Sequence, residues 1–257
     1  MTEASAWEPM FEFYEARLGD DRLVVLLDLN ASQHAPVASH PYRLEILVPM
    51  LQPRPDGLRS SEEAPALFAV EDTVVDRLTA AFSVLYVGRF VARRSTTLVF
   101  YAPSALTPGD VASRIGAIDP YRPVVHVEED AGWEFYRDFL WPGPYALQGI
   151  MNRQLLAVRA EHGDRAEIVR EVDHMVLFPT RAALDAAAAR LASLGYRIDP
   201  VEAPEEDGRW ALGFHRDERL DEDRPDGFVT EILDIVLPLE GDYDGWGAQI
   251  EAGAETH

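Results

Sequence analysis

The chain has 257 residues, of which 47% are hydrophobic and 10% aromatic, so it is long and apolar enough for one or two ordinary domains. It contains no cysteine, which excludes disulfides, thiolate zinc sites and cysteine nucleophiles. Its formal net charge of −22 argues against direct binding to nucleic acid or anionic membranes and favours a basic protein partner.

The first half of the chain predicts a hairpin followed by a mixed unit of strands and helices. Two strand-like runs, 11–18 and 22–30, flank the turn residues Gly19-Asp20-Asp21. Further strands and helices are expected, in chain order, at 42–50, 62–82, 84–92, 96–102, 107–118 and 122–130. From residue 42 the order is therefore β-α-β-β-α-β, which is the ferredoxin-like motif.

The same order of elements returns in the second half. Strands and helices are expected at 168–178, 179–195, 196–202, 209–216, 227–240 and 243–250. We therefore predict an α+β protein with two tandem ferredoxin-like (βαββαβ) units, each an antiparallel sheet with helices on one face. The predicted domains are 1–141 and 165–257, joined by a connection at 142–164 that is expected to be mostly helical after Pro144.

Capping residues mark several of the expected helix ends. Ser60 and Ser61 with Glu63, and Thr107 before Pro108, are typical of helix starts. Thr180 is expected to cap the alanine-rich helix, and Gly195 to end it.

The stretch "LEGDYDGWGAQIE" (239–251) crowds carboxylates, aromatics and glycines, and we interpret it as structural. Gly241 is expected to end the last helix in the left-handed conformation. Tyr243 and Trp246 are expected to anchor the last strand, with Gly245 and Gly247 relieving crowding beside them. Asp242 and Asp244 are expected to form turns. The stretch lacks the ligand pattern of a calcium loop.

Two longer stretches resemble known families. "REVDHMVLFPTRAALDAAAARLASLGYRID" and, further on, "GDYDGWGAQI" resemble the family of regulators of ribonuclease E activity B (RraB-like proteins), over about residues 160–250. "HPYRLEILVPM", "DGLRSSEE", "YVGR" and "WEFYRDFLWP" resemble a bacterial family of unknown function that often precedes such a domain. The resemblance implies a small acidic ferredoxin-like domain that binds ribonuclease E and restrains its cleavage of RNA without being an enzyme. Here that domain is fused to a large N-terminal partner, so ribonuclease control is an analogy at the level of the family.

Acidic segments on both sides of the third strand of the second unit are candidates for binding a basic partner. These partner-binding candidates are Glu202, Glu205, Glu206, Asp207, Asp217, Glu218, Asp221, Glu222 and Asp223. A strand between them should place the two segments at opposite ends of the sheet, as an extended surface rather than a compact catalytic cluster. Solvated loops without a partner are the alternative interpretation.

Histidines supply the alternative site chemistry. His174 and His215 are expected on neighbouring strands, where they could approach each other across the sheet, and Asp173 is expected to cap or to pair with an arginine such as Arg170. His34 and His40 lie in a proline-containing loop. No third metal ligand is evident, so we predict no metal and no cofactor.

The aromatic string "WEFYRDFLW" (133–141) is expected to pack at the domain junction rather than to bind a ligand, with Trp133, Tyr136 and Leu140 on one face.

The function predicted from the sequence is a non-enzymatic, cytoplasmic regulator that binds a basic segment of a protein, with a ribonuclease as the candidate partner. A small-molecule or metal-binding protein, or a hydrolase with a site at the domain junction, remains the alternative. A homodimer through exposed edge strands is a third possibility.

Overall fold

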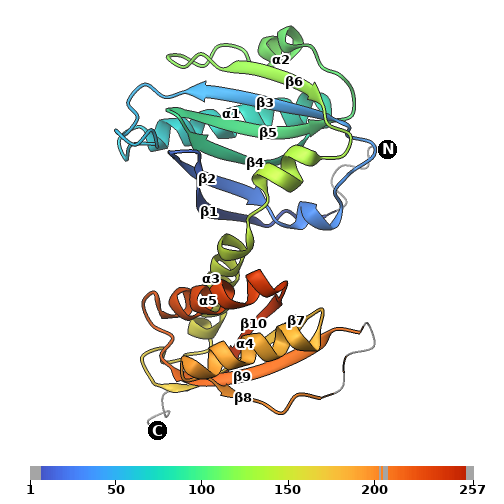
Figure 1. Cartoon of the computed structure of the whole chain (residues 1–257). Helices are drawn as coiled ribbons and strands as arrows, with labels where there is room; N and C mark the ends of the chain where they lie inside the picture. Colours follow the sequence, from blue (N-terminus) through green and yellow to red (C-terminus); the bar gives the residue numbers. More distant parts are fainter. Residues whose placement is uncertain (1–6, 203, 205–207, 253–257) are drawn as a thin grey trace. The chain divides into compact units, whose positions relative to one another are not determined.

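The computed structural model describes residues 7–202, 204 and 208–252 (Figure 1). The chain divides into two compact units, Met1–Pro142 and Gly143–His257. Each unit contains one sheet whose strand pairs are all antiparallel, together with helices, so the predicted α+β class is confirmed.

The first unit is built on a six-stranded sheet. Its strands are β1 (Phe11–Leu18), β2 (Asp21–Asp28), β3 (Tyr42–Pro49), β4 (Leu85–Ala92), β5 (Ser95–Ala102) and β6 (Val124–Glu129). Their order in the sheet is β1-β2-β4-β5-β3-β6. From β3 onward, β5 lies between β3 and β4, which is the split arrangement expected of a β-α-β-β-α-β unit. The predicted hairpin β1-β2 extends the sheet beyond β4.

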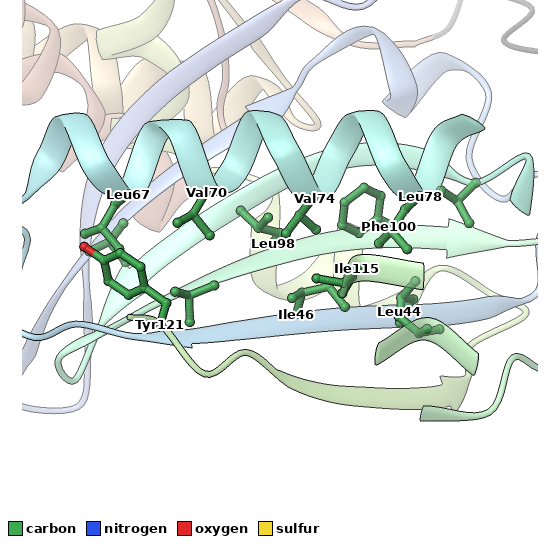
Figure 2. Close-up of a cluster of buried hydrophobic side chains, with 14 of the residues drawn as sticks. Leu44, Ile46, Leu67, Val70, Val74, Leu78, Leu98, Phe100, Ile115 and Tyr121 are labelled. Carbon is green, nitrogen blue, oxygen red and sulfur yellow. The ribbon is translucent and has the colours of Figure 1, made fainter. Parts of the chain in front are cut away.

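Helix α1 (Ala64–Phe82) covers one face of this sheet, and α2 (Pro108–Ile115) packs against α1. Figure 2 shows Leu67, Val70, Val74 and Leu78 of α1 pointing toward Leu44 and Ile46 of β3 and Leu98 and Phe100 of β5. These side chains are all 5% exposed or less, so the helical spacing of apolar residues correctly predicted the buried face. Burying each aliphatic side chain stabilises the unit by roughly 1.5–3 kcal/mol.

The aromatic string that follows β6 packs within the first unit. Trp133 stacks on Tyr101 of β5 with ring centroids 3.9 Å apart. Tyr136 and Leu140 lie on a single π-type helical turn, η2 (Phe135–Leu140), and with Trp133 they are at most 1% exposed. Trp133, Tyr136 and Leu140 are thus buried together in the first unit, although Trp133 precedes the helical turn.

The second unit is built on a four-stranded sheet in the order β10-β7-β9-β8. Its strands are β7 (Arg170–Phe178), β8 (Arg197–Ile198), β9 (Trp210–Glu218) and β10 (Asp242–Ala248). Its helices are α3 (Pro144–Glu161), α4 (Arg181–Ser193) and α5 (Arg224–Val236), and the short 3-10 turn η3 (Leu237–Leu239) follows α5. In the first unit a short 3-10 turn, η1 (Asn30–Gln33), follows β2. The core joins Val172, Val176 and Phe178 of β7 to residues of β9, α4 and α5.

Two of the predicted helix starts and one helix end are confirmed in atomic detail. The hydroxyl of Thr107 accepts a hydrogen bond from the backbone N–H of Asp110, and that of Thr180 accepts one from Ala183. Gly195 has a φ of 89°, the left-handed conformation expected after a helix. The strand expected at 196–202 is only two residues long, and the helix expected at 227–240 instead runs from Arg224 to Val236.

None of the described helices combines the length and apolar character that a membrane-spanning helix needs.

Candidate partner-binding face of the second unit

The closing stretch of the chain forms the edge strand β10, but Gly241 does not have the role predicted for it. The left-handed residue after η3 is Glu240, with a φ of 56°. A Cβ on Gly241 would lie 2.7 Å from Cε1 of Phe178 and 3.0 Å from Cβ of Val236. Glycine is required here because β10 enters the sheet in close contact with the core, so the predicted helix-ending role is corrected to close packing.

Two aromatic side chains fix β10 to the rest of the unit. Tyr243 is 6% exposed, and its backbone carbonyl accepts a hydrogen bond from the Gln148 amide of α3. Trp246 donates its indole N–H to Oδ1 of Asn152, also on α3, at 2.8 Å. Between Tyr243 and Trp246, the register of β10 against β7 shifts at Asp244 and Gly245, and Gly245 has a φ of 111°. This irregularity is a β-bulge. The turn role predicted for Asp242 is wrong, because Asp242 lies in the strand and pairs with Arg209.

His174 lies in the core of the second unit rather than in a metal site. Its ring stacks on Phe214 at 5.2 Å, and its Nδ1 shares a hydrogen bond of 2.9 Å with the Tyr243 hydroxyl. Burial, followed by the charge of Arg216, lowers the pKa of His174 to about 3. The imidazole is therefore neutral at physiological pH.

His174 and His215 do not approach each other across the sheet, although neighbouring strands would have allowed it. The register of β7 and β9 pairs His174 with Phe214 and Asp173 with His215, so the two histidines point to opposite faces of the sheet. Arg170 is bonded to Asp164 rather than to Asp173.

His34 and His40, the two histidines of the proline-containing loop, contact different residues. His34 stacks on Trp7, and the Nε2 of His40 bonds to the backbone carbonyl of Ser83. Among the described residues, no group of three or more His, Asp and Glu side chains is placed to hold a metal ion.

The sheet of the second unit presents alternate side chains of β7 on the face opposite its core. Val172, His174 and Val176 are buried, whereas Glu171, Asp173 and Met175 are exposed. Met175 is 40% exposed, and the register pairs it with Gly213 on one side and Gly245 on the other. A flexible apolar side chain thus projects from a flat surface between two glycines.

Several carboxylates lie on the same surface as Met175. Arg197 lies between Glu171 and Asp217, at 2.9 Å from each carboxylate. His215 lies 3.1 Å from Asp199 and 3.5 Å from Glu171. We call Glu171, Asp173, Asp199 and Asp217, with Met175 and Arg197, the acidic sheet face. With His215 neutral, four carboxylates against one guanidinium leave a charge of −3.

The structure distributes the partner-binding residues predicted from the sequence among different settings. Glu205, Glu206 and Asp207 lie outside the described residues. Asp217 belongs to the acidic sheet face, whereas Glu218 pairs with Arg216 and Asp221 with Arg219. Glu202, Glu222 and Asp223 are exposed.

Sequence reasoning missed Glu171, Asp199 and Met175. For Glu171 and Met175 the signal was present, because the alternation Glu171, Asp173, Met175 marks one face of a strand. Asp199 gave no such signal, since only the folded sheet brings it beside His215.

Comparison with known proteins separates the two halves of the chain. The profile of the family described as "Regulator of ribonuclease activity B" matches residues 149–248. A "Family of unknown function" known as DUF695 matches residues 10–141.

Individual relatives support the match of the second half. A "Regulator of ribonuclease activity B" from Idiomarina loihiensis is 34% identical over 92 residues, which cover 35% of this chain and 72% of that protein. One from Pseudoalteromonas translucida is 28% identical over 104 residues, which cover 39% of this chain and 94% of that protein.

A solved structure of an unknown protein from Galdieria sulphuraria aligns with 82% of this chain and 99% of that chain. Its identity of 11% and TM-score of 0.22 support no inference.

Proposed function

Because the chain belongs, through residues 149–248, to the family of regulators of ribonuclease activity B, and through residues 10–141 to a family of unknown function, we propose that it regulates a ribonuclease by binding it. The observation that carries this proposal is the 34% identity over 92 residues to a protein named for that activity. The first target to test is an enzyme of the ribonuclease E type.

The acidic sheet face is the surface that fits a basic segment of such a partner. Its charge of −3 would steer an arginine- or lysine-rich segment toward the second unit. Met175, which is 40% exposed, offers an apolar contact on the same surface. The exposed carboxylates of Glu202, Glu222 and Asp223 would add to the attractive field over a longer range. The negative charges of Glu205, Glu206 and Asp207, which lie outside the described residues, would contribute to the same field.

A regulator of this kind would act without chemistry of its own. Occupying a basic segment of the ribonuclease would compete with the RNA phosphates that the same segment attracts, because both ligands are anionic. Binding should therefore weaken as salt concentration rises.

The experiment begins with affinity capture of the full chain from nuclease-treated lysate of the source organism, at low and at high salt. We expect recovery of a ribonuclease that is lost at high salt. The purified ribonuclease is then assayed on a fluorogenic RNA with and without this protein, and we expect slower cleavage when the protein is added. Capture of no ribonuclease, or unchanged cleavage, contradicts the proposal.

A pair of variants matched in charge tests the surface. Glu171→Lys/Asp173→Lys changes the acidic sheet face, and Glu161→Lys/Glu240→Lys changes two exposed carboxylates at the ends of α3 and η3. Each double variant alters the net charge by the same amount. We expect the first to slow association about tenfold at low salt and the second to leave it near the wild-type rate. Equal effects of the two variants would show that only the overall charge matters.

A further inference from the structure

A small pocket in the first unit gathers arginines in a protein of strongly negative charge. It has a volume of about 310 Å³ and lies on the α1 side of the sheet, between α1 and the strands β2 and β4. Val24 and Leu26 of β2, Leu58 and Phe68 provide apolar walls, and Arg59 and Arg89 provide the charge.

Arg59 and Arg89 share one carboxylate. Arg89 bonds to Oε1 of Glu71 at 2.5 Å, whereas the nearest guanidinium nitrogen of Arg59 is 3.7 Å from Oε2 of Glu71. The Tyr86 hydroxyl donates a further hydrogen bond to Glu71 at 2.7 Å. The side chains of Arg59 and Arg89 are only 11% and 18% exposed. Two largely buried cations therefore face one anion.

Arg59 is the less satisfied of the two. Its Nε donates to Thr96 at 3.0 Å, but its buried Nη2 has no hydrogen-bond partner in the part of the chain that the structure describes. Burial and the charge of Arg89 lower the pKa of Arg59 to about 10. A buried guanidinium without full pairing is costly, and an anion in the pocket would remove that cost.

Arg22 and Arg54 also line the pocket, and their ion pairs do not remove this excess of positive charge. Arg22 pairs with Glu15 and with Asp56, and Arg54 pairs with the same Asp56. Counted with Arg59, Arg89 and Glu71, the pocket has four guanidinium groups and three carboxylates, a net charge of +1. The chain as a whole has a net charge of −22.

An aromatic ring completes the pocket. The guanidinium carbons of Arg59 and Arg89 lie 4.9 and 5.4 Å from the centroid of the Phe68 ring. Phe68 is itself 45% exposed, which is unusual for a phenylalanine on a helix that otherwise packs on the sheet. The ring thus holds the two cations and leaves part of its apolar surface for a ligand.

We propose that this pocket binds a small organic monocarboxylate, with its carboxylate on Arg59 and Arg89 and its apolar body against Phe68, Val24 and Leu26. The charge of +1 matches one anion, and a planar carboxylate fits a guanidinium through two parallel hydrogen bonds. At roughly 30 Å³ for each non-hydrogen atom, the volume admits about ten such atoms. The pocket lies in the first unit, so this inference is independent of the ribonuclease proposal.

The test is calorimetric titration of the full chain with acetate, isovalerate, phenylacetate and indole-3-acetate, and with phenylacetamide and benzyl phosphate for comparison. We expect the affinity to rise with the apolar body up to phenylacetate, and phenylacetamide to bind at least tenfold more weakly because it has no charge. Absence of binding by all four carboxylates at ~10 mM, which corresponds to less than about 3 kcal/mol, overturns the proposal.

Variants locate the site. Arg59→Met and Phe68→Ala should each weaken phenylacetate binding at least tenfold, whereas Arg114→Met, which changes an exposed arginine of α2, should not. Because Phe68 is already half exposed, its variant remains informative if Arg59→Met fails to fold. Unchanged binding by Phe68→Ala, equal binding of phenylacetamide, or tighter binding of benzyl phosphate than of phenylacetate each contradicts the proposal.

Discussion

At the scale of single residues, His174 shows how strongly the core of the second unit dictates protonation. The side chain is 3% exposed, and within the described part of the chain its ring makes one hydrogen bond, to Tyr243. Its Nε2 is buried without a partner among the described residues. Charging this ring would place an unpaired cation in the core, so the folded protein keeps His174 neutral.

This leads to a prediction about pH. An unfolded histidine binds a proton below pH 6.5, whereas the folded pKa of His174 is about 3, so stability is lost as pH falls between these values. The loss from pH 7 to pH 5 should be about 2 kcal/mol for this group. Urea denaturation at both pH values should show that His174→Phe removes this part of the pH dependence.

The control for that prediction is His162→Gln, which changes an exposed histidine of the same unit and should keep the wild-type pH dependence. The phenylalanine variant also leaves the Tyr243 hydroxyl without its partner, which lowers stability at every pH by a similar amount. An identical slope for wild type and His174→Phe would show that other groups cause the loss.

At the scale of secondary-structure elements, one buried carboxylate ties three elements of the second unit together. Asp164 accepts from Nε of Arg159 at the end of α3, from Arg170 at the start of β7 and from the backbone N–H of Glu251 after β10. Arg159 also donates to the carbonyls of Ala248 and Gln249, at 2.7 Å each. Since these three side chains are at most 7% exposed, water cannot replace the lost contacts.

Asp164→Asn should therefore destabilise the second unit by roughly 3–5 kcal/mol, because it leaves two buried arginines without their shared anion. Asp185→Asn breaks an exposed pair with Arg181 on α4 and should cost less than about 1 kcal/mol. Urea denaturation of the two variants measures both values. A loss below about 1 kcal/mol for Asp164→Asn would mean that the network does not secure the end of β10.

The elements also show where sequence reasoning succeeds and fails. Strand alternation, the spacing of Leu67, Val70 and Leu78, and the caps at Thr107 and Thr180 are local signals, and each correctly predicted its element. Strand β8 was overestimated because its pairing with β9 stops after two residues, which depends on where the following loop turns.

The errors about sites arise from contacts between distant residues. Contact between His174 and His215 depended on the register of β7 and β9, because a shift of one residue moves a side chain to the other face of the sheet. Gly241 was assigned to a helix end because its contact with Phe178, far away in sequence, was invisible. The same limit applies to the pocket in the first unit, where Arg59 and Arg89 meet at Glu71 only after folding.

At the scale of the whole molecule, each unit has a core made of its own elements. The first core joins β3, β4, β5, α1 and α2, and the second joins β7, β9, β10, α4 and α5, with α3 packed on α5. Among the described residues, the buried side chains of the first core lie within 44–121 and those of the second within 172–243. Each unit is also long enough to bury an adequate fraction of its own surface.

We therefore predict that residues 143–257 fold alone, whereas residues 165–257 do not form the same stable unit. The shorter fragment lacks α3 and Asp164, and with them the partners of Trp246, of the Tyr243 carbonyl and of Arg170. Thermal denaturation followed by circular dichroism should give a cooperative transition for the longer fragment, and a broad or strongly lowered one for the shorter. Equal stability of the two fragments would show that α3 only connects the two units. The expected difference would show that the second unit needs α3 for its stability.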